Sequence, residues 1–322
     1  MNTPLLLIAW RRPHTLRQVI NAIRPVTPTR LFVACDGPNP DRPGEAEKVA
    51  ATRQLIEQEI DWPCQIERLY SGVNQGCRFG VSRAITWFFE QVEEGIILED
   101  DCVPHPDFFP YCTTLLERFR HDIRVWSICG SNFQLGNRRG DASYYFSIHG
   151  DSWGWASWRR AWAHYHEAEM NWIHFRDSGR LDDVFQIPQE RAYWRETLDL
   201  LFTKGIPSTW DYQWWLASWM HHGLHAWPNC SLVSNNGFDY DGTHTVGESR
   251  FANLQLKPLG ELTHPVYVLP CRDADEHAFL HRRNGVAMLE KEKFGHAYKW
   301  ILRWRRLLHE GPIQYLLARL LR

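Results

Sequence analysis

Short apolar runs alternate with amphipathic stretches through the first 120 residues, and this alternation limits the possible folds most strongly. Four runs have the length and composition of strands: 5–10, 30–35, 65–70 and 96–98. Four stretches have helical periodicity: 15–23, 45–60, 81–92 and 106–119. A strand–helix rhythm of this kind predicts an α/β fold, in which a mostly parallel sheet is flanked by helices.

The fourth predicted strand ends in three adjacent carboxylates, Glu99, Asp100 and Asp101. Asp36 also follows a strand directly, and in such sheets ligands bind beyond the carboxyl ends of the strands. Three neighbouring negative charges add nothing to packing, and their repulsion makes ionisation costly unless a positive group lies between them. We expect that positive group to be a divalent cation with a preference for oxygen ligands.

Composition narrows the class of protein. With 322 residues, 44% hydrophobic and 23% charged, the chain is that of a folded protein, and a net charge of -2 gives no overall field that would recruit nucleic acid. The eight cysteines form no Cys-x-x-Cys pair, so no zinc ribbon is indicated. No secretion signal or run of membrane-spanning length is evident, which predicts a cytoplasmic protein with reduced thiols. The 17 tryptophans suit sugar-binding surfaces, although we expect most of them in the core.

The second half of the chain is less regular. Residues 138–162 are loop-like and aromatic, residues 189–203 and 209–222 are predicted to be helical, and residues 235–247 are rich in turns. No internal repeat or low-complexity linker separates the halves, so the sequence does not demand two independent domains.

The last segment, residues 299–322, is distinct. It has six Lys or Arg residues against one acid, a net charge of +5, and two apolar stripes separated by Gly311-Pro312. Basic amphipathic helices of this type lie on anionic membranes, and such a helix can equally dock on its own protein. Both interpretations stay open.

Strand-end pairs of aspartates can hold Mn²⁺ or Mg²⁺ against a diphosphate, so that the charge on a leaving group is neutralised. Over residues 1–135 the chain resembles the GT-A fold glycosyltransferases, especially bacterial family-2-like enzymes and the N-acetylglucosaminyltransferase I group. The resemblance is carried by four segments in order: 5–13 (LLLIAWRRP), 33–37 (VACDG), 74–90 (beginning NQGCR and ending WFFE) and 97–109 (ILEDDCVPHPDFF). The segments 153–158 (WGWASW) and 236–245 (NGFDYDGTHT) are similar to elements of the same bacterial group.

The resemblance implies a role for several residues. Asp101 would bind the metal ion, Asp100 and Glu99 would face the ribose and the donor sugar, and Asp36 would accept a hydrogen bond from the base. Arg11 or Arg12 would lie beside the nucleotide. Asn74 and Arg78 precede a helix N-terminus, where backbone N–H groups favour anions. His244, in a late loop, would be a further metal ligand.

Residues 136–298 are predicted to form the acceptor-binding and catalytic half of the same domain. Asp211 is our candidate for the base that deprotonates an acceptor hydroxyl, because flanking tryptophans should desolvate it and raise its pKa. The alternative role of Asp211 is structural, as the cap of the helix that follows it. Asp151 and Glu196 are weaker candidates for the base. Trp153, Trp155 and Trp158 could stack against sugar rings, although we expect at least one of them to be structural.

These observations favour a metal-dependent, inverting glycosyltransferase that uses a nucleoside diphosphate sugar. UDP is the default nucleotide, with GDP and dTDP open, and the acceptor is predicted to be a saccharide or a lipid-linked saccharide. A sugar-nucleotide pyrophosphorylase is a second possibility, but the first strand is followed by Trp10 to Pro13 and not by a glycine-rich loop. A non-catalytic carbohydrate-binding protein is the third.

Overall fold

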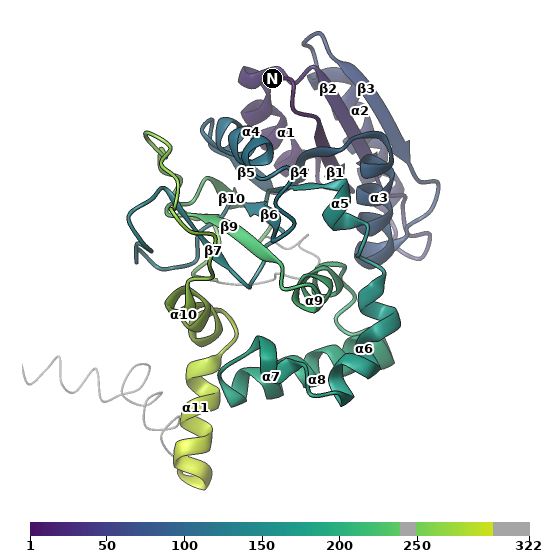
Figure 1. The fold of residues 1–322 in the computed structure, drawn as a ribbon. Coiled ribbons are helices and arrows are strands. Elements are labelled where there is room, and N and C mark those ends of the chain that lie inside the picture. The colour runs from purple at the N-terminus through teal and green to yellow at the C-terminus, as the bar shows by residue number, and fades with distance from the viewer. Residues whose placement is uncertain (239–248, 299–322) are drawn as a thin grey trace, which may run out of the picture.

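The computed structural model describes residues 1–238 and 249–298. Their centre is an eight-stranded sheet with the strand order β3-β2-β1-β4-β8-β6-β9-β7 (Figure 1). The strands are β1 (Leu5–Ala9), β2 (Arg30–Cys35), β3 (Gln65–Tyr70), β4 (Glu94–Glu99), β6 (Val125–Cys129), β7 (Tyr144–Ser147), β8 (Trp155–Trp158) and β9 (Leu224–Pro228). The predicted α/β architecture is thereby confirmed.

Strand direction places the carboxyl ends of six strands at one edge of the sheet. β1 pairs in parallel with β2 and β4, β2 with β3, and β6 with β9. β8 runs antiparallel to both β4 and β6, so β6 and β9 point the same way as β1. Only β7 and β8 among these eight strands run in the opposite direction. The sheet therefore continues from the first half of the chain into the second without a break.

Helices cover both faces of the sheet. Alternate residues of a strand point to opposite faces, and Leu5 and Leu7 of β1 pack with α1 (Pro13–Ile23), α2 (Glu45–Glu59) and α4 (Phe108–Arg118). Leu6 and Ile8 pack on the other face with α3 (Ser82–Gln91), which continues from a π-helical turn at Cys77–Val81. A proline in the first turn starts α1, as its fixed φ favours.

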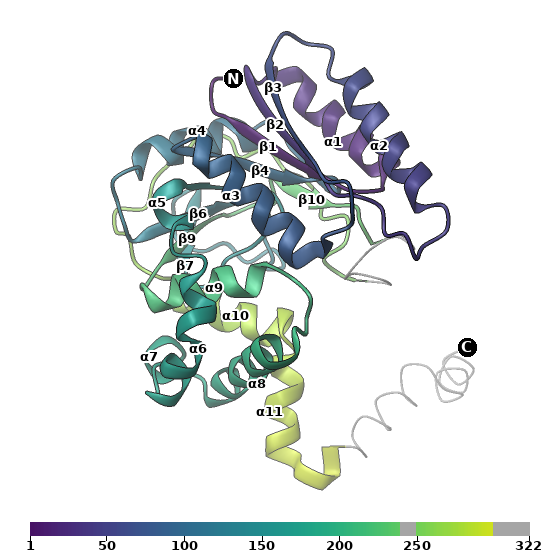
Figure 2. The ribbon, with the colours of Figure 1, turned by 90° about the vertical axis from the view of Figure 1, so that its right-hand side faces the viewer.

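Most of the remaining seven helices in the described residues gather at the end of the molecule away from α1 and α2 (Figure 2). These seven helices are α5 (Arg159–Trp162), α6 (Glu167–Asp177), α7 (Leu181–Val184), α8 (Pro188–Lys204), α9 (Asp211–Met220), α10 (Arg272–Arg282) and α11 (Gly285–Phe294). A separate antiparallel pair joins β5 (Cys102–Pro104) to β10 (Val233–Asn235). Short 3₁₀ turns lie at Arg24–Val26 and Gly295–Ala297.

Most tryptophans are core residues, as expected from their number. On the α3 face, one apolar cluster includes Trp126, Trp155, Trp162, Trp172, Trp194, Trp210, Trp214, Trp215 and Trp219. The indole N–H groups of four of these have no hydrogen-bond partner in the described residues: Trp155, Trp194, Trp214 and Trp215. Burial of a large apolar ring outweighs a lost hydrogen bond of about 1–3 kcal/mol, so such rings are tolerated inside.

The sequence prediction was wrong for residues 138–162. This segment holds two strands, β7 and β8, which both lie inside the main sheet. Their pattern, YYFS and WASW, is short and lacks the aliphatic run that marks β1 or β2. The two helices expected at 189–203 and 209–222 are confirmed as α8 and α9.

Among the described residues, no helix combines the length and the apolar character that crossing a lipid bilayer requires. The basic segment 299–322, for which membrane contact is a prediction, lies outside the described residues.

Candidate active site at the strand ends

A cavity of about 310 Å³ opens where β1, β2, β3 and β4 end. It lies on the α3 side of the sheet, because α3 and the preceding turn form one of its walls. Its polar and aromatic lining consists mainly of Trp10, Arg12, Asp36, Arg42, Tyr70, Asn74, Gln75, Cys77, Arg83, Glu99, Asp100 and Ser208. The edge predicted from strand order thus carries a hollow of the size of a small-molecule site.

Asp36, directly after β2, forms part of the cavity wall and holds the loop at residues 71–76. Its carboxylate accepts hydrogen bonds from the backbone N–H groups of Gly37 (2.8 Å), Gln75 (3.0 Å) and Gly76 (3.1 Å). The Asn74 amide donates to the same carboxylate at 3.1 Å. Burial raises the pKa of Asp36, and these hydrogen bonds oppose the shift. Asp36 and Asn74 therefore both line the cavity, and the hydrogen bonds that Asp36 accepts hold the loop that forms its wall.

The wall beside Asp36 leaves no space for an added side chain. A Cβ atom on Gly37 would lie 2.5 Å from the backbone nitrogen and carbonyl carbon of Val73. Gly72, in the same loop, has no heavy atom of the described residues within 4 Å of its added Cβ. Glycine at position 37 is thus required by close approach of two backbone segments.

Arg12 is the positive group between the acids. Its Nη2 atom donates to Asp101 Oδ2 at 2.8 Å and also to Asp100 Oδ1, and Asp100 Oδ2 accepts the backbone N–H of Trp10 at 3.1 Å. Burial would lower the pKa of Arg12, but the charges of Asp100 and Asp101 outweigh burial and raise it. We call Arg12, Glu99, Asp100 and Asp101 the acidic rim.

Arg12 thus supplies positive charge between the acids, a contact that the sequence did not predict, and the divalent cation stays a prediction. Register explains the contact: Ile8 of β1 lies beside Glu99 of β4, so the residues that follow β1 come next to the residues that follow β4. Arg11 and Arg12 are visible in the sequence directly after the predicted first strand. Which acid they contact depends on which strand lies beside β1, and the sequence does not show this.

Glu99 is the acid of the rim that Arg12 does not bind. It is half-buried, it lines the cavity, and no hydrogen bond from the described residues reaches its carboxylate. Burial raises its pKa well above the ordinary value, and the charges of Asp101 and Asp100 raise it further against the opposing effect of Arg12.

Asp211, the first residue of α9, lies close to Glu99 and not in the cavity lining itself. Its charge contributes to the raised pKa of Glu99, and both carboxylates act on the thiol of Cys77, whose pKa is raised above all by burial. Asp211 accepts a hydrogen bond from the Thr209 hydroxyl at 2.6 Å. Burial raises the pKa of Asp211, as expected from its aromatic surroundings.

Two predicted arginines lie outside the cavity lining. Arg11 pairs with the buried Glu45 at 2.7 Å and covers the Trp10 ring at 4.3 Å. Arg78 pairs with Glu169 of α6 at 3.3 Å. In this structure both arginines join secondary-structure elements, and their roles toward a nucleotide stay predictions.

The predicted sugar-stacking wall is wrong for Trp155 and Trp158. Trp155 is fully buried against Trp210, with ring centroids 5.6 Å apart, and Trp158 is buried on the opposite face of the sheet. Trp153 is partly exposed and contacts Phe133. The indoles of Trp155 and Trp158 are packed into the core on either face of the sheet and have no access to a ligand.

The weaker candidates for a base lie apart from the acidic rim. Asp151 is buried and pairs with Arg282 of α10 at 2.6 Å. Glu196 is exposed on α8. Neither lines the strand-end cavity.

The carboxylates of the acidic rim have the ligand chemistry that a divalent cation prefers, although their oxygens do not form one of the groups of three or more ligand atoms within 4.8 Å of one another in the described residues. Mg²⁺ and Mn²⁺ prefer carboxylate oxygens and take most other ligands from substrate phosphates and water. The Glu99 carboxylate accepts no hydrogen bond from the described residues, and Asp101 Oδ1 accepts a hydrogen bond from the Cys102 thiol at 3.4 Å. His244, the predicted further ligand, lies outside the described residues.

Comparison with known proteins assigns no family. No model of a known protein family matches the chain, and no curated protein matches it. A mannose-1-phosphate geranyltransferase from Thermus thermophilus aligns with 72% of this chain and 75% of its own, at 11% identity and a TM-score of 0.33. Mouse xyloside xylosyltransferase 1 aligns over 69% and 83%, at 11% identity and a TM-score of 0.31. A UDP-glucose pyrophosphorylase complexed with UDP-glucose aligns over 52% and 80%, at 11% identity and 0.31.

Proposed function

We propose that this protein is a glycosyltransferase that binds a nucleoside diphosphate sugar, UDP-sugar by default, in the strand-end cavity. The observation that carries the proposal is the cavity itself. It lies at the carboxyl ends of parallel strands, and Arg12, Glu99 and Asp100 line it, with Arg12 also bound to the adjacent Asp101. Ligands of open α/β sheets bind at this edge.

The nucleoside would occupy the part of the cavity between Asp36 and the loop at residues 71–76. Trp10 and Tyr70 offer aromatic surface there, and Asn74 offers a polar edge. The diphosphate would then extend toward Arg12, whose guanidinium can bind phosphate oxygens as well as carboxylates. In the absence of a ligand Arg12 thus balances the charge of the acids, and in the complex it would help to hold the diphosphate.

A divalent cation, Mn²⁺ or Mg²⁺, would be held by Asp101 with the contribution of Glu99, and it would supply neutralisation of the charge on the departing diphosphate. Because Asp101 Oδ2 is bound by Arg12, this arginine would have to shift its contact toward Asp100 or the diphosphate. His244 remains our proposal for a further ligand.

Asp211 would accept the proton of the acceptor hydroxyl in an inverting displacement. Its raised pKa makes it a stronger base than an exposed aspartate, and α9 brings it to the side of the cavity that Glu99 and Cys77 occupy. The acceptor, a saccharide or lipid-linked saccharide, would approach from the second half of the chain, at residues 136–298.

The two alternative functions make different predictions. A pyrophosphorylase would need a basic, glycine-rich loop after β1, and here the chain passes through Trp10 and Arg12 straight into α1. A carbohydrate-binding protein would need exposed aromatic rings, whereas most tryptophans are buried in the core. Both observations favour the glycosyltransferase.

The test is donor hydrolysis by the full chain with UDP-, GDP- and dTDP-sugars, with and without Mn²⁺. We expect hydrolysis with Mn²⁺, and a loss of about 100-fold or more in Asp101→Asn, because a bound metal contributes several kcal/mol to the transition state. Asp182→Asn, an exposed aspartate on α7 that pairs with Arg191, is the matched control.

Calorimetry with UDP and Mn²⁺ makes the test independent of turnover. Loss of Mn²⁺-dependent UDP binding in Asp101→Asn supports the proposal. Full activity of that variant would overturn the assignment of the acidic rim. Formation of nucleoside triphosphate from pyrophosphate would identify a pyrophosphorylase, and saccharide binding without nucleotide binding would identify a carbohydrate-binding protein.

A further inference from the structure

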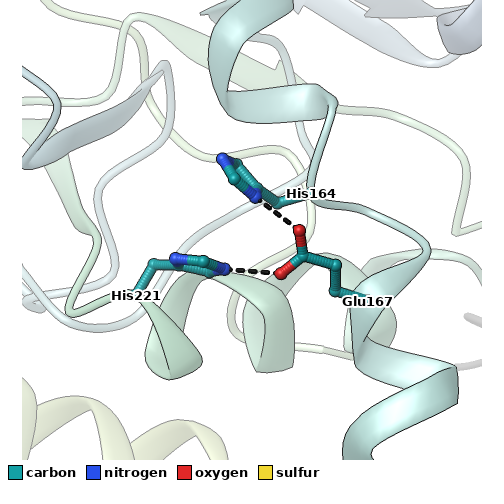
Figure 3. A group of neighbouring side chains, drawn as sticks. All are labelled: His164, Glu167 and His221. Carbon is teal, nitrogen blue, oxygen red and sulfur yellow. Dashed lines mark hydrogen bonds and ion pairs between the residues drawn. The ribbon is translucent and has the colours of Figure 1, made fainter.

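Two histidines and one glutamate converge on the surface between α6 and α9 (Figure 3). His164 Nδ1 lies 2.8 Å from Glu167 Oε1, and His221 Nε2 lies 2.7 Å from Glu167 Oε2. All three ligand atoms lie within 4.8 Å of one another, and each side chain is 36% exposed. We call these residues the histidine–glutamate cluster.

The chain builds this cluster from separate elements. His164 and Glu167 lie three residues apart where α6 begins, whereas His221 follows the last residue of α9, 54 residues beyond Glu167. The contact between α6 and α9 is therefore what brings the second imidazole to the carboxylate.

Trp126 of β6 orients both imidazole rings. Its ring centroid lies 5.5 Å from that of His164 and 5.5 Å from that of His221, at interplanar angles of 31° and 28°. Trp126 is itself buried, so it provides a rigid surface under the two rings. Support of ligand side chains by packing is what makes a metal site precise.

The cluster lies at the opposite edge of the sheet from the strand-end cavity. Trp126 is the second residue of β6, and His221 comes three residues before β9 begins. β6 and β9 run parallel to β1, so the amino ends of these strands are at the edge away from Asp36 and the acidic rim. The cluster is consequently separate from the proposed transfer chemistry.

We propose that His164, Glu167 and His221 bind a divalent transition-metal ion, with Zn²⁺ the best match. Neutral imidazole and carboxylate are common Zn²⁺ ligands, and three protein ligands leave a position for water in a tetrahedral site. Such bonds of about 2.0–2.1 Å hold ligand atoms about 3.4 Å apart, so the carboxylate and the imidazoles must separate by about 0.6 Å. Partial exposure of all three side chains leaves room for this movement.

A bound ion would connect the start of α6 to the end of α9. Because the ion binds the folded chain, it stabilises that chain by mass action. α9 begins with Asp211, so the ion would also fasten the helix that carries the proposed base. The inference itself does not depend on the proposed function, since metal binding is measured without nucleotide.

The test uses the untagged full chain, freed of metal with a chelator. Zn²⁺ titration by calorimetry should show one ion per chain that binds at the histidine–glutamate cluster and is not lost in Asp101→Asn, and Co²⁺ should produce the visible absorption of a tetrahedral site. The melting temperature should rise with Zn²⁺. His164→Ala and His221→Gln should each lower the affinity about 10-fold or more, in line with the sensitivity of metal sites to their ligand shell.

His174→Ala provides the matched control, because His174 is an exposed histidine on the same helix. Melting of every variant without metal separates loss of binding from loss of fold. Absence of Zn²⁺ binding, or binding that His164→Ala and His221→Gln leave unchanged, would overturn the inference.

Discussion

The acidic rim and the histidine–glutamate cluster have similar chemistry in opposite environments. At the rim one guanidinium donates to two carboxylates, with a nitrogen–oxygen distance of 2.8 Å to Asp101, and in the cluster two imidazoles contact one carboxylate, with nitrogen–oxygen distances of 2.7 and 2.8 Å. Arg12, Asp100 and Asp101 are largely withdrawn from solvent, at 4–11% side-chain exposure, whereas the histidine–glutamate cluster is 36% exposed. Since water competes for exposed charges and cannot reach buried ones, the same contact should matter far more at the rim.

Removing the guanidinium of the rim tests this difference most directly. Arg12→Met leaves two buried carboxylates without a positive partner, and we expect the free energy of unfolding to fall by about 3–5 kcal/mol. Chemical denaturation measures the change. Adding Asp100→Asn and Asp101→Asn should restore much of the loss. Arg17→Met, which removes an exposed pair with Glu59, should cost less than about 1 kcal/mol. Equal losses of unfolding free energy in Arg12→Met and Arg17→Met would contradict the expectation that burial strengthens the contact at the rim.

Asp275 of α10 extends the comparison to a buried carboxylate that pairs with no guanidinium among residues 1–238 and 249–298. It accepts a hydrogen bond from the Ser147 hydroxyl at 2.5 Å, and burial raises its pKa to about 6. A raised pKa in the folded state means that protonation favours folding, so this stabilisation is complete below about pH 4 and is lost as the pH rises through about 6.

We therefore expect Asp275→Asn to gain up to about 3 kcal/mol relative to the wild type between about pH 4 and pH 7. Denaturation curves of both proteins over this pH range measure the difference. The asparagine oxygen can still accept from Ser147, so the hydrogen bond is conserved. A difference that does not vary with pH would show that Asp275 does not titrate in this way.

Close packing makes the cavity wall sensitive to an added methyl group at one glycine and not at another. Gly37→Ala forces a methyl group against the Val73 backbone, and we expect a loss of about 1–3 kcal/mol together with weaker nucleotide binding. Gly72→Ala, in the same loop with open space around it, should change stability by less than about 0.5 kcal/mol. Thermal denaturation and UDP titration of both variants test whether the wall at Gly37 shapes the cavity; equal effects would contradict it.

The smallest effect is expected at the exposed cluster without metal. Glu167→Gln should lower stability by less than about 1 kcal/mol, and added salt should shrink the difference. Hydrogen bonds from His164 and His221 lower the pKa of Glu167, so its contribution is present above the ordinary glutamate pKa and is lost as the pH falls below it. Denaturation at two salt concentrations measures this. A loss as large as that of Arg12→Met would show that exposure does not govern the difference.

The fold of the first half was well predicted because local sequence determines it. Strands β2 and β3 have the predicted bounds, and α2 differs by one residue. Continuous apolar runs and helical stripes act over neighbouring residues, so they are visible in sequence. Strands β6 and β9 were not predicted, and β7 and β8 were taken for loop. These four strands are only four or five residues long and carry polar or aromatic side chains.

The candidate site shows the same division. The placement of Asp36, Glu99, Asp100 and Asp101 at one edge of a parallel sheet could be predicted from the sequence, because strand direction follows from the strand–helix rhythm. The contact of Arg12 with Asp100 and Asp101, the burial of Trp155 and the contact of His221 with Glu167 became visible only in the folded chain. Each of these depends on which strands or helices are neighbours in space, and that choice is made by the packing of the whole core, not by any local stretch of sequence.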